Sequence, residues 1–270
     1  MGSDDMSDKP DQSKILSRTI ETLIWIVAIV GLYLALVPPM GHPDYVRRIP
    51  ECKNHLKTIM IGIHSYHDAF RCLPPAWTSA PDGSRLHSWR SLILPYVGHN
   101  ELYARLRLNE PWDSTHNRRV TNEAPKEISE LFRCSNAHPN DAARENAGYL
   151  AVVGKSTAWE PSRRVTFSDV GDGNSNTLCL VEVIHSDIHW AEPRDLSLFA
   201  LISERRVSRQ PKIGSYDGVK RHDQIADSFN VGVMDGSVRR VSVDMTGEQL
   251  SQLAIINDGL PSSGSSHPFK

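Results

Sequence analysis

Two pairs of histidines have spacings that could bring two imidazoles to one metal ion. His64 and His67 are three residues apart, with Asp68 beside them, and His185 and His189 are four apart. On a helix either spacing places both side chains on one face. The residues before His185 favour a strand, where that spacing separates the side chains by about 13 Å. No further ligand is evident, so we predict no metal centre, with His67 hydrogen-bonded in the core and His64 solvated.

The segment DVGDGNSN is rich in oxygen ligands, as calcium-binding loops are. Its candidate ligands are Asp169, Asp172, Asn174 and Asn176. An EF-hand needs Asp or Asn at alternate positions, Gly at the sixth and Glu at the twelfth, and no register of this segment meets that pattern. We therefore favour a tight Asp-Gly turn in which Asn and Ser side chains cap the backbone, with an irregular calcium site as the alternative. No other cofactor is predicted.

Local patterns of catalysis and of nucleotide binding are missing from the chain. It has no G-x-S-x-G elbow, S-x-x-K motif, papain-like cysteine context, P-loop or dinucleotide fingerprint. We predict that the protein is not an enzyme and nominate no catalytic residue. The formal net charge is −2, and no run of Lys and Arg exceeds two residues, so we expect no nucleic-acid binding.

The elements that position these residues begin with an apolar segment from Ile20 to Val37. A helix of this length spans about 27 Å, close to the hydrocarbon core of a bilayer. No Ala-x-Ala-like step follows it, which argues against a cleaved signal peptide. We predict a disordered tail over residues 1–13 and a transmembrane anchor over residues 14–38, with a cleaved signal or a buried soluble helix as alternatives. Basic residues flank both ends, so charge alone does not give the orientation.

A second helix is predicted after the prolines at positions 38, 39, 43 and 50, which prevent the anchor from continuing unbroken. In ECKNHLKTIMIGIHSYHDAF apolar residues recur with helical spacing, which is typical of an amphipathic helix packed on a core. This helix should end before LPPAW. Its core face is predicted to consist of Leu56, Ile59, Met60 and Ile63, continued by Tyr66, His67 and Phe70.

Short strands and a closing helix are predicted further along the chain. FNVGVMDGSVRRVSV has valines on both sides of Asp235-Gly236, which indicates a hairpin, and AGYLAVVG and TLCLVEVIHSDIHW indicate further strands. In TGEQLSQLAII, Thr246 and Gln249 have the spacing of a capping box. We therefore expect an α+β domain over residues 45–260 and a disordered tail over residues 261–270.

Seven stretches follow one another in the order of a known family's motifs. They are CKNHLKTIMIGIHSYHDAFRCLPPAW, SWRSLILPYVGHNELYARL, NEPWDSTHN, LFRCSNAH, FSDVGDGNSNTLCLVE, HWAEPRDL and HDQIADSFNVGVMDGSVRRVS. Together they resemble the bacterial DUF1559 proteins, which are often described as pilin-like and carry a C-terminal H-x9-DG motif. The motif residues, whose role in the family is unknown, are Asn54, His67, Asp68, Pro74, Pro75, Trp89, Pro95, Asp172, Gly173, Asn176, Thr177, Glu182, His222, Asp235 and Gly236. Here twelve residues rather than nine separate His222 from the Asp-Gly pair, so the loop between them is enlarged.

The resemblance implies a pilin-like fold, in which the second helix packs on an antiparallel sheet after a transmembrane helix. It also implies a single-pass protein of the inner membrane, with a cytoplasmic N-terminus and an extracytoplasmic domain. Two family motifs carry cysteine, which implies a Cys52–Cys134 disulfide if the domain is extracytoplasmic. Cys72 and Cys179 are then expected to be buried free thiols, with a second disulfide as the alternative. The resemblance does not imply any chemical reaction.

The apolar segment resembles a pilin helix whose processing signature is lost. Aligned through Gly31, the cleavage-site glycine and phenylalanine of pilins fall on Ser17 and Arg18, and their glutamate falls on Thr22 rather than Glu21. We therefore expect an uncleaved anchor in a protein that acts by binding or assembly, with the membrane and secretion-type or pilus-like proteins as partners. The alternative is a solute- or glycan-binding module, or an enzyme on the same scaffold, that uses the Asp172–Asn176 turn and the loop after His222.

Overall fold

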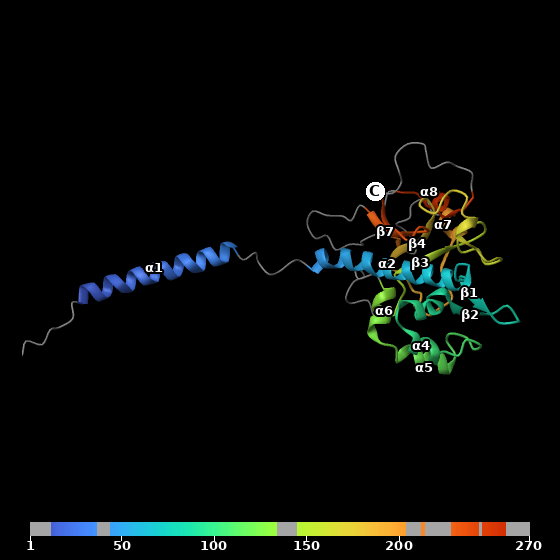
Figure 1. The fold of residues 1–270 in the computed structure, drawn as a ribbon, viewed down its shortest axis with the longest axis horizontal. Coiled ribbons are helices and arrows are strands. Elements are labelled where there is room, and N and C mark those ends of the chain that lie inside the picture. The colour runs from blue at the N-terminus through green and yellow to red at the C-terminus, as the bar shows by residue number, and fades with distance from the viewer. Residues whose placement is uncertain are drawn as a thin grey trace, which may run out of the picture. The chain divides into compact units, whose positions relative to one another are not determined.

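The computed structural model of the chain describes residues 12–36, 44–133, 145–203, 212–213, 228–242 and 245–257. It contains two compact units, Met1–Arg47 and Arg48–Lys270. The second unit contains both helices and an antiparallel sheet (Figure 1). The predicted α+β class is confirmed.

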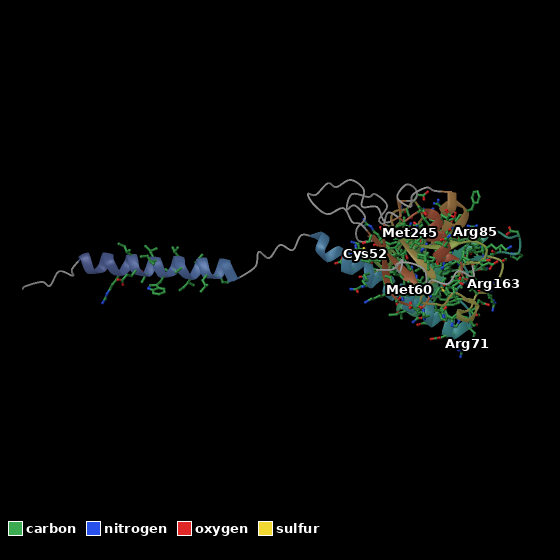
Figure 2. The ribbon with its side chains drawn as sticks, turned by 90° about the horizontal axis from the view of Figure 1, so that it is seen from above. Cys52, Met60, Arg71, Arg85, Arg163 and Met245 are labelled. Atoms are coloured by element: carbon green, nitrogen blue, oxygen red, sulfur yellow. The ribbon has the colours of Figure 1, made fainter. Side chains whose placement is uncertain are left out.

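The first unit contains one helix, α1 (Gln12–Leu36). Its described side chains are exposed, and Leu23, Trp25 and Val27 are 60%, 70% and 68% accessible. Apolar sticks project from several sides of this helix in Figure 2. Among the residues that the structure describes, no helix combines the length and the apolarity required to cross a bilayer. The transmembrane anchor over residues 14–38 stays a prediction.

The predicted amphipathic helix is α2 (Asp44–Phe70), which begins four residues before the boundary between the units and lies mainly in the second. Its predicted core residues are buried, since Leu56, Ile59 and Ile63 are 0% exposed and Met60 is 1% exposed. The helix ends where LPPAW was expected to stop it. It begins earlier than predicted, directly after Pro43, so that Pro50 lies inside the helix and removes one backbone hydrogen bond.

Phe70 does not continue the core face of α2. Its side chain is 55% exposed, whereas Tyr66 is only partly buried against the core. The expectation that Phe70 faces the core is wrong. Phe70 is the last residue of the helix and packs on Tyr66 with tilted rings, whose centroids are 4.4 Å apart. Helical periodicity gives the direction of a side chain, but not whether a partner element reaches that end of the helix.

The main sheet has the strand order β5–β3–β4–β7–β8. These strands are β5 (Leu196–Ser197), β3 (Tyr149–Val153), β4 (Leu178–His185), β7 (Ser228–Val233) and β8 (Val238–Ser242). Neighbouring strands are antiparallel except β5, which runs parallel to β3, and β6 (Lys212–Ile213) also pairs with β4. The predicted hairpin around Asp235-Gly236 is confirmed as β7–β8, with Gly232 opposite Val238.

Helices cover both faces of this sheet. Along β3, Tyr149 and Ala151 pack in the same cluster as the α2 residues, while Leu150 and Val152 pack with Leu250. This alternation is expected for a strand, because successive side chains point to opposite faces. One face therefore carries α2, and the other carries α7 (Leu198–Ser203) and α8 (Gly247–Ala254). Figure 1 shows the same arrangement.

The helix α2 lies close to the sheet at Gly232. A Cβ atom on this glycine would be 2.7 Å from the Met60 sulfur and 3.5 Å from the Leu180 Cβ. Figure 2 labels Cys52, Met60 and Arg71, which mark the course of α2 and the residue after it. Glycine at this strand position lets the methionine side chain reach the β7 backbone.

The remaining short elements were not predicted. They are the hairpin β1 (Trp77–Ser79) and β2 (Arg85–Ser88), helices α3 (Trp89–Leu92), α4 (Asn100–Arg105), α5 (Thr115–Asn122) and α6 (Lys126–Phe132), and the 3₁₀ turns η1 (Leu94–Val97) and η2 (Phe167–Asp169). Apart from α5, which has eight residues, these helices carry less than two repeats of the helical pattern, so periodicity does not reveal them. The closing helix α8 is confirmed, and Thr246 and Gln249 form both bonds of the capping box at 3.1 and 2.9 Å.

Candidate functional site

The two Asp-Gly turns singled out in the sequence meet in the structure. The Asp235 backbone N–H donates to the Asn174 carbonyl at 3.0 Å, and the Met234 N–H donates to the Thr177 carbonyl at 2.9 Å. Gly173 and Gly236 have φ angles of +91° and +83°, which glycine adopts without the steric cost of a Cβ atom. We call Asp172–Thr177 with Met234–Gly236 the double turn.

His64 of α2 lies against the double turn. A Cβ atom on Gly236 would be 3.3 Å from His64 Nε2. The pKa of His64 is lowered, because desolvation of its imidazolium outweighs the opposing backbone hydrogen bond with Met234 and the nearby Asp68 and Asp235 carboxylates. The expectation of a solvated His64 is wrong, since contact with the Gly236 turn covers part of the ring.

His67 and His64 both pack on Phe167. The ring centroid of Phe167 is 4.1 Å from that of His67 and 4.6 Å from that of His64. Neither ring nitrogen of His67 has a hydrogen-bond partner in the described part of the chain, although both are buried, and His64 Nε2 and Asn174 Oδ1 share this property. The expectation that His67 is hydrogen-bonded is wrong, because its ring packs on an aromatic side chain.

We call these four buried polar atoms the His64–His67–Asn174 cluster, because both histidines contact Phe167 and His64 contacts the double turn that contains Asn174. A buried polar atom without a partner costs about 1–3 kcal/mol. Such atoms are uncommon in native structures, where they often mark a place that a water molecule or a ligand completes. The cluster is therefore the candidate functional site of the described residues.

Two of the predicted calcium ligands, Asp169 and Asn176, have hydrogen-bond partners within the chain. Asp169 Oδ2 accepts hydrogen bonds from the Thr166 N–H at 2.7 Å and from the Thr166 hydroxyl at 2.9 Å. These bonds lower the pKa of Asp169. The Asn176 side-chain amide donates to the Asp172 carbonyl at 3.1 Å. Asp169 and Asn176 therefore bind groups of the chain itself, as the turn interpretation expects, whereas Asn174 Oδ1 has no partner among the described residues. No described group of three His, Cys, Asp or Glu side chains could hold a metal ion.

The second histidine pair does not share a strand. β4 ends at His185, and His189 lies beyond it, in an isolated bridge with Asn146. The expectation that both histidines extend from one face of a strand is wrong, because the strand stops four residues too early. His189 has a separate environment against Trp112 and Trp190.

The Gly236 contact gives a testable prediction. Gly236→Ala should lower the free energy of unfolding by about 1–2 kcal/mol through its positive φ alone, and further through the contact with His64. Gly83→Ala is the matched control, because Gly83 has φ +85° and nothing within 4 Å of an added Cβ. Urea denaturation of both variants would measure the difference. Equal losses would contradict the proposed contact between α2 and the double turn.

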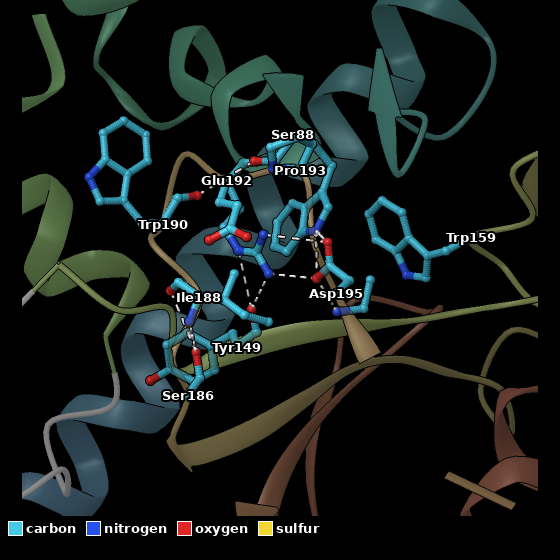
Figure 3. A network of polar contacts seen from close by, with 12 residues as sticks. Ser88, Tyr149, Trp159, Ser186, Ile188, Trp190, Glu192, Pro193 and Asp195 are labelled. Atoms are coloured by element: carbon cyan, nitrogen blue, oxygen red, sulfur yellow. Dashed lines mark hydrogen bonds and ion pairs between the residues drawn. The ribbon is translucent and has the colours of Figure 1, made fainter. Parts of the chain in front are cut away.

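A second polar network lies in the core, where the sequence had marked only Trp89. Arg90 and Asp195 form an ion pair with Nη2 and Oδ1 2.5 Å apart and both side chains 0% exposed (Figure 3). Asp195 also accepts from the Ala151 N–H at 2.9 Å and from Trp89 Nε1 at 3.2 Å. Burial raises the pKa of Asp195, and Arg90, Ala151 and Trp89 oppose that shift. Since all of these partners donate, they stabilise an ionised carboxylate.

Tyr149 extends this network to α2. Its carbonyl accepts from Arg90 Nε at 3.3 Å and from Nη2 at 3.0 Å, and its hydroxyl donates to the Cys52 carbonyl at 2.9 Å. The network thus joins β3, α3, α2 and the residue before β5. Because these contacts connect four segments of the core, we interpret the network as structural. Arg90 and Asp195 were missed as site residues, although they stand within the SWR and PRDL motifs.

Glu182 forms a third buried contact, between β4 and β7. Its Oε2 accepts from the Asn230 backbone N–H and from Asn230 Nδ2, both at 2.8 Å. Glu182 is 3% exposed and Asn230 is 4% exposed. The carboxylate thus accepts a hydrogen bond from a strand N–H that would otherwise pair with a main-chain carbonyl. This explains structurally why an acidic residue stands in an apolar strand.

The other predicted residues are spread over the unit. Asn54, Asp68 and Pro75 are exposed, Pro95 is half-buried in η1, and Pro74 is buried. Cys52 is buried on α2, but Cys134 and His222 lie outside the described residues, so the disulfide and the enlarged loop stay predictions. Cys72 and Cys179 are buried free thiols. Burial raises the pKa of Cys179 to about 12.

Comparison with known proteins gives one match. Residues 47–155 match the model of a family described as a protein of unknown function (DUF1559). No curated protein and no solved structure matches the chain. The matched residues include α2 from Arg47 onward, Trp89, Arg90 and β3, and they end before Glu182 and Asp195.

Proposed function

From a chain whose residues 47–155 belong to the DUF1559 family, we propose a single-pass protein of the inner membrane that acts by binding or assembly rather than by catalysis. Its N-terminus would be cytoplasmic, and its α+β unit would lie outside the cytoplasm. The family is one of unknown function, so the proposal rests on the chemistry of the chain itself.

The observation that carries the proposal is the apolar surface of α1. Large apolar side chains between Ile20 and Tyr33 are at least 50% exposed, and by sequence the apolar stretch continues to Val37, beyond the described residues. Exposing this much contiguous apolar surface to water is unfavourable, whereas a lipid bilayer would cover it. Glu21 stands near one end of the stretch, where a carboxylate can reach the headgroup region.

Membrane attachment can be tested with charges placed in the middle of α1. Each lysine at the centre of a membrane-spanning helix costs about 2.5–3.5 kcal/mol, so an Ile24→Lys/Ile29→Lys variant should move from the membrane fraction to the soluble fraction. The matched control is Ile24→Leu/Ile29→Leu, which should stay with the membrane. Extraction with alkaline carbonate and flotation of the pellet would measure both. Release of the unaltered chain by carbonate would contradict the proposal.

Binding rather than catalysis is supported by the state of the polar groups. The Cys179 thiol has a pKa raised to about 12 and is 1% exposed, which makes it a poor nucleophile. The carboxylates of Asp195 and Glu182 accept hydrogen bonds from donors in the core.

Self-assembly would appear as crosslinked oligomers of the membrane-bound chain. The Ile24→Lys/Ile29→Lys variant should form fewer of these oligomers.

A solute-binding role is the second candidate, and the unpartnered atoms of the His64–His67–Asn174 cluster favour it. A ligand that satisfied these atoms would bind the native state selectively and raise the melting temperature. Calcium and cell-wall glycan fragments are the probes to use. A rise that disappears in Asn174→Ala but persists in the exposed-residue control Asn54→Ala would favour this second function over assembly.

A further inference from the structure

His189 lies outside the candidate site, where two short segments pair. The Ala147 N–H donates to the Ile188 carbonyl at 2.7 Å, and the Trp190 N–H donates to the Glu145 carbonyl at 2.8 Å. Asn146 and His189 form the bridge between these bonds. Residues 145–147 lead into β3, and residues 188–190 lead toward Asp195. We call this paired region the 145–190 clasp.

The hydrogen bonds of the His189 ring define one neutral tautomer. The Ala191 backbone N–H donates to Nδ1 at 3.1 Å, so Nδ1 must present a lone pair. The ring hydrogen then sits on Nε2, which lies 3.2 Å from Glu145 Oε2 and donates to it. A doubly protonated imidazolium has donors at both nitrogens and would place two N–H groups against each other at Ala191.

Aromatic side chains shield this ring from water. Trp112 stacks on it with ring centroids 5.2 Å apart, and the centroid of Trp190 is 5.7 Å away. Trp190 in turn stacks on Phe132 of α6, at 5.8 Å. The side chain of His189 is 17% exposed. Such surroundings disfavour a charged imidazolium.

Some charged groups around His189 raise its pKa, and others lower it. Its pKa is lowered, with desolvation as the largest cause; Arg118 of α5 adds to the shift, while Glu145 and Glu192 oppose it. Glu192 accepts the His189 backbone N–H at 3.2 Å and is itself paired with Arg194, which also pairs with Asp187. Part of the negative charge near the ring is therefore already neutralised.

We propose that His189 is an acid-sensitive latch that holds the 145–190 clasp closed in its neutral form and releases it on protonation. A hydrogen added to Nδ1 removes the acceptor for the Ala191 N–H, and the imidazolium draws water between the tryptophans. The clasp bonds of Ala147 and Trp190 then open more often. The segment that carries Asp195 becomes looser as a result. This device goes beyond the proposed function and does not depend on it.

The direction of the pH effect follows from linkage. Because the folded pKa lies below the unfolded value, neutral His189 stabilises the closed clasp above the unfolded pKa, and that contribution is lost as pH falls toward the folded value. Opening should therefore increase on acidification below neutrality. Acidic conditions, and not alkaline ones, release the latch.

The test is amide hydrogen exchange on the full chain, from about pH 8 to about pH 5. After correction for intrinsic exchange, protection of the Ala191, Ala147 and Trp190 amides should fall about tenfold or more. The Leu250 amide of α8, which donates to the Thr246 carbonyl at 3.0 Å, reports on unrelated structure and should fall less. Imidazole nitrogen shifts at the upper pH should show hydrogen on Nε2.

Variants of His189 distinguish release of the latch from a general loss of stability in acid. His189→Asn keeps an acceptor near the position of Nδ1 and does not titrate, so protection of Ala191 should persist at low pH. His189→Phe should reduce protection at every pH, and the control His99→Asn should behave like the unaltered chain. Unchanged protection of Ala191 in the unaltered chain, or hydrogen on Nδ1 at the upper pH, would overturn the proposal. If His189→Asn does not fold, the nitrogen shifts and the unaltered chain still decide it.

Discussion

Asp195→Ala is expected to lower the free energy of unfolding by about 3–5 kcal/mol, because it leaves the buried Arg90 guanidinium without a counter-ion. The same substitution removes the acceptor for the Ala151 and Trp89 N–H groups. Urea denaturation followed by tryptophan fluorescence would measure the loss. The slope of the unfolding free energy against urea should stay unchanged if the native state remains compact.

Two further variants identify the cause of that loss. Replacing both partners, as Arg90→Met/Asp195→Leu, should recover a large part of the lost stability, because two apolar side chains carry no unpaired charge. The control Glu123→Ala removes a carboxylate that pairs with Arg105 and Arg119 at the surface and should have little effect. A double variant as unstable as Asp195→Ala would show that shape, rather than the unpaired charge, is responsible.

Glu182→Ala should destabilise the protein by about 3 kcal/mol, since it leaves the Asn230 backbone N–H and side-chain amide buried without this acceptor. Glu182→Gln keeps a carbonyl oxygen at nearly the same position. Its loss should be about half as large, because a neutral acceptor binds donors less strongly than a carboxylate does. Thermal unfolding monitored by circular dichroism would rank the two variants.

The pairing partner supplies the converse test. Asn230→Asp would place two carboxylates together and should destabilise the protein more as pH rises, because repulsion grows when both are ionised. A Glu182→Ala variant as stable as the unaltered chain would contradict the role given to Glu182. Glu182 would then be a motif residue whose role the structure does not explain.

Elements with local chemical signals were predictable from the sequence. The capping box at Thr246 identified the start of α8, and the Asp235-Gly236 turn identified the β7–β8 hairpin. The core face of α2 followed from the spacing of Leu56, Ile59, Met60 and Ile63. In each case the signal lies within a few residues, where backbone geometry alone relates sequence to structure.

The contacts that build the candidate site are not local. Asp172 and Asp235 were recognisable as turn residues, but nothing in either turn reveals that Asn174 accepts a hydrogen bond from the Asp235 N–H. The partner of His67 was also unpredictable, because Phe167 is distant in sequence. From the sequence, Arg90 and Asp195 could be recognised only as members of the SWR and PRDL motifs. Their burial as an ion pair depends on the complete fold.

Because Arg90 and Asp195 are far apart in the sequence, the ribosome makes them at different times. The two residues are 105 positions apart, so a ribosome that adds about 5–20 residues per second makes the carboxylate about 5–20 s after the guanidinium. In the last part of that interval the nascent chain has the residues for α2, α3 and β3 but not the counter-ion that their core requires. The matched segment, residues 47–155, does not contain Asp195, so the core of this unit is completed only after Asp195 has been synthesised.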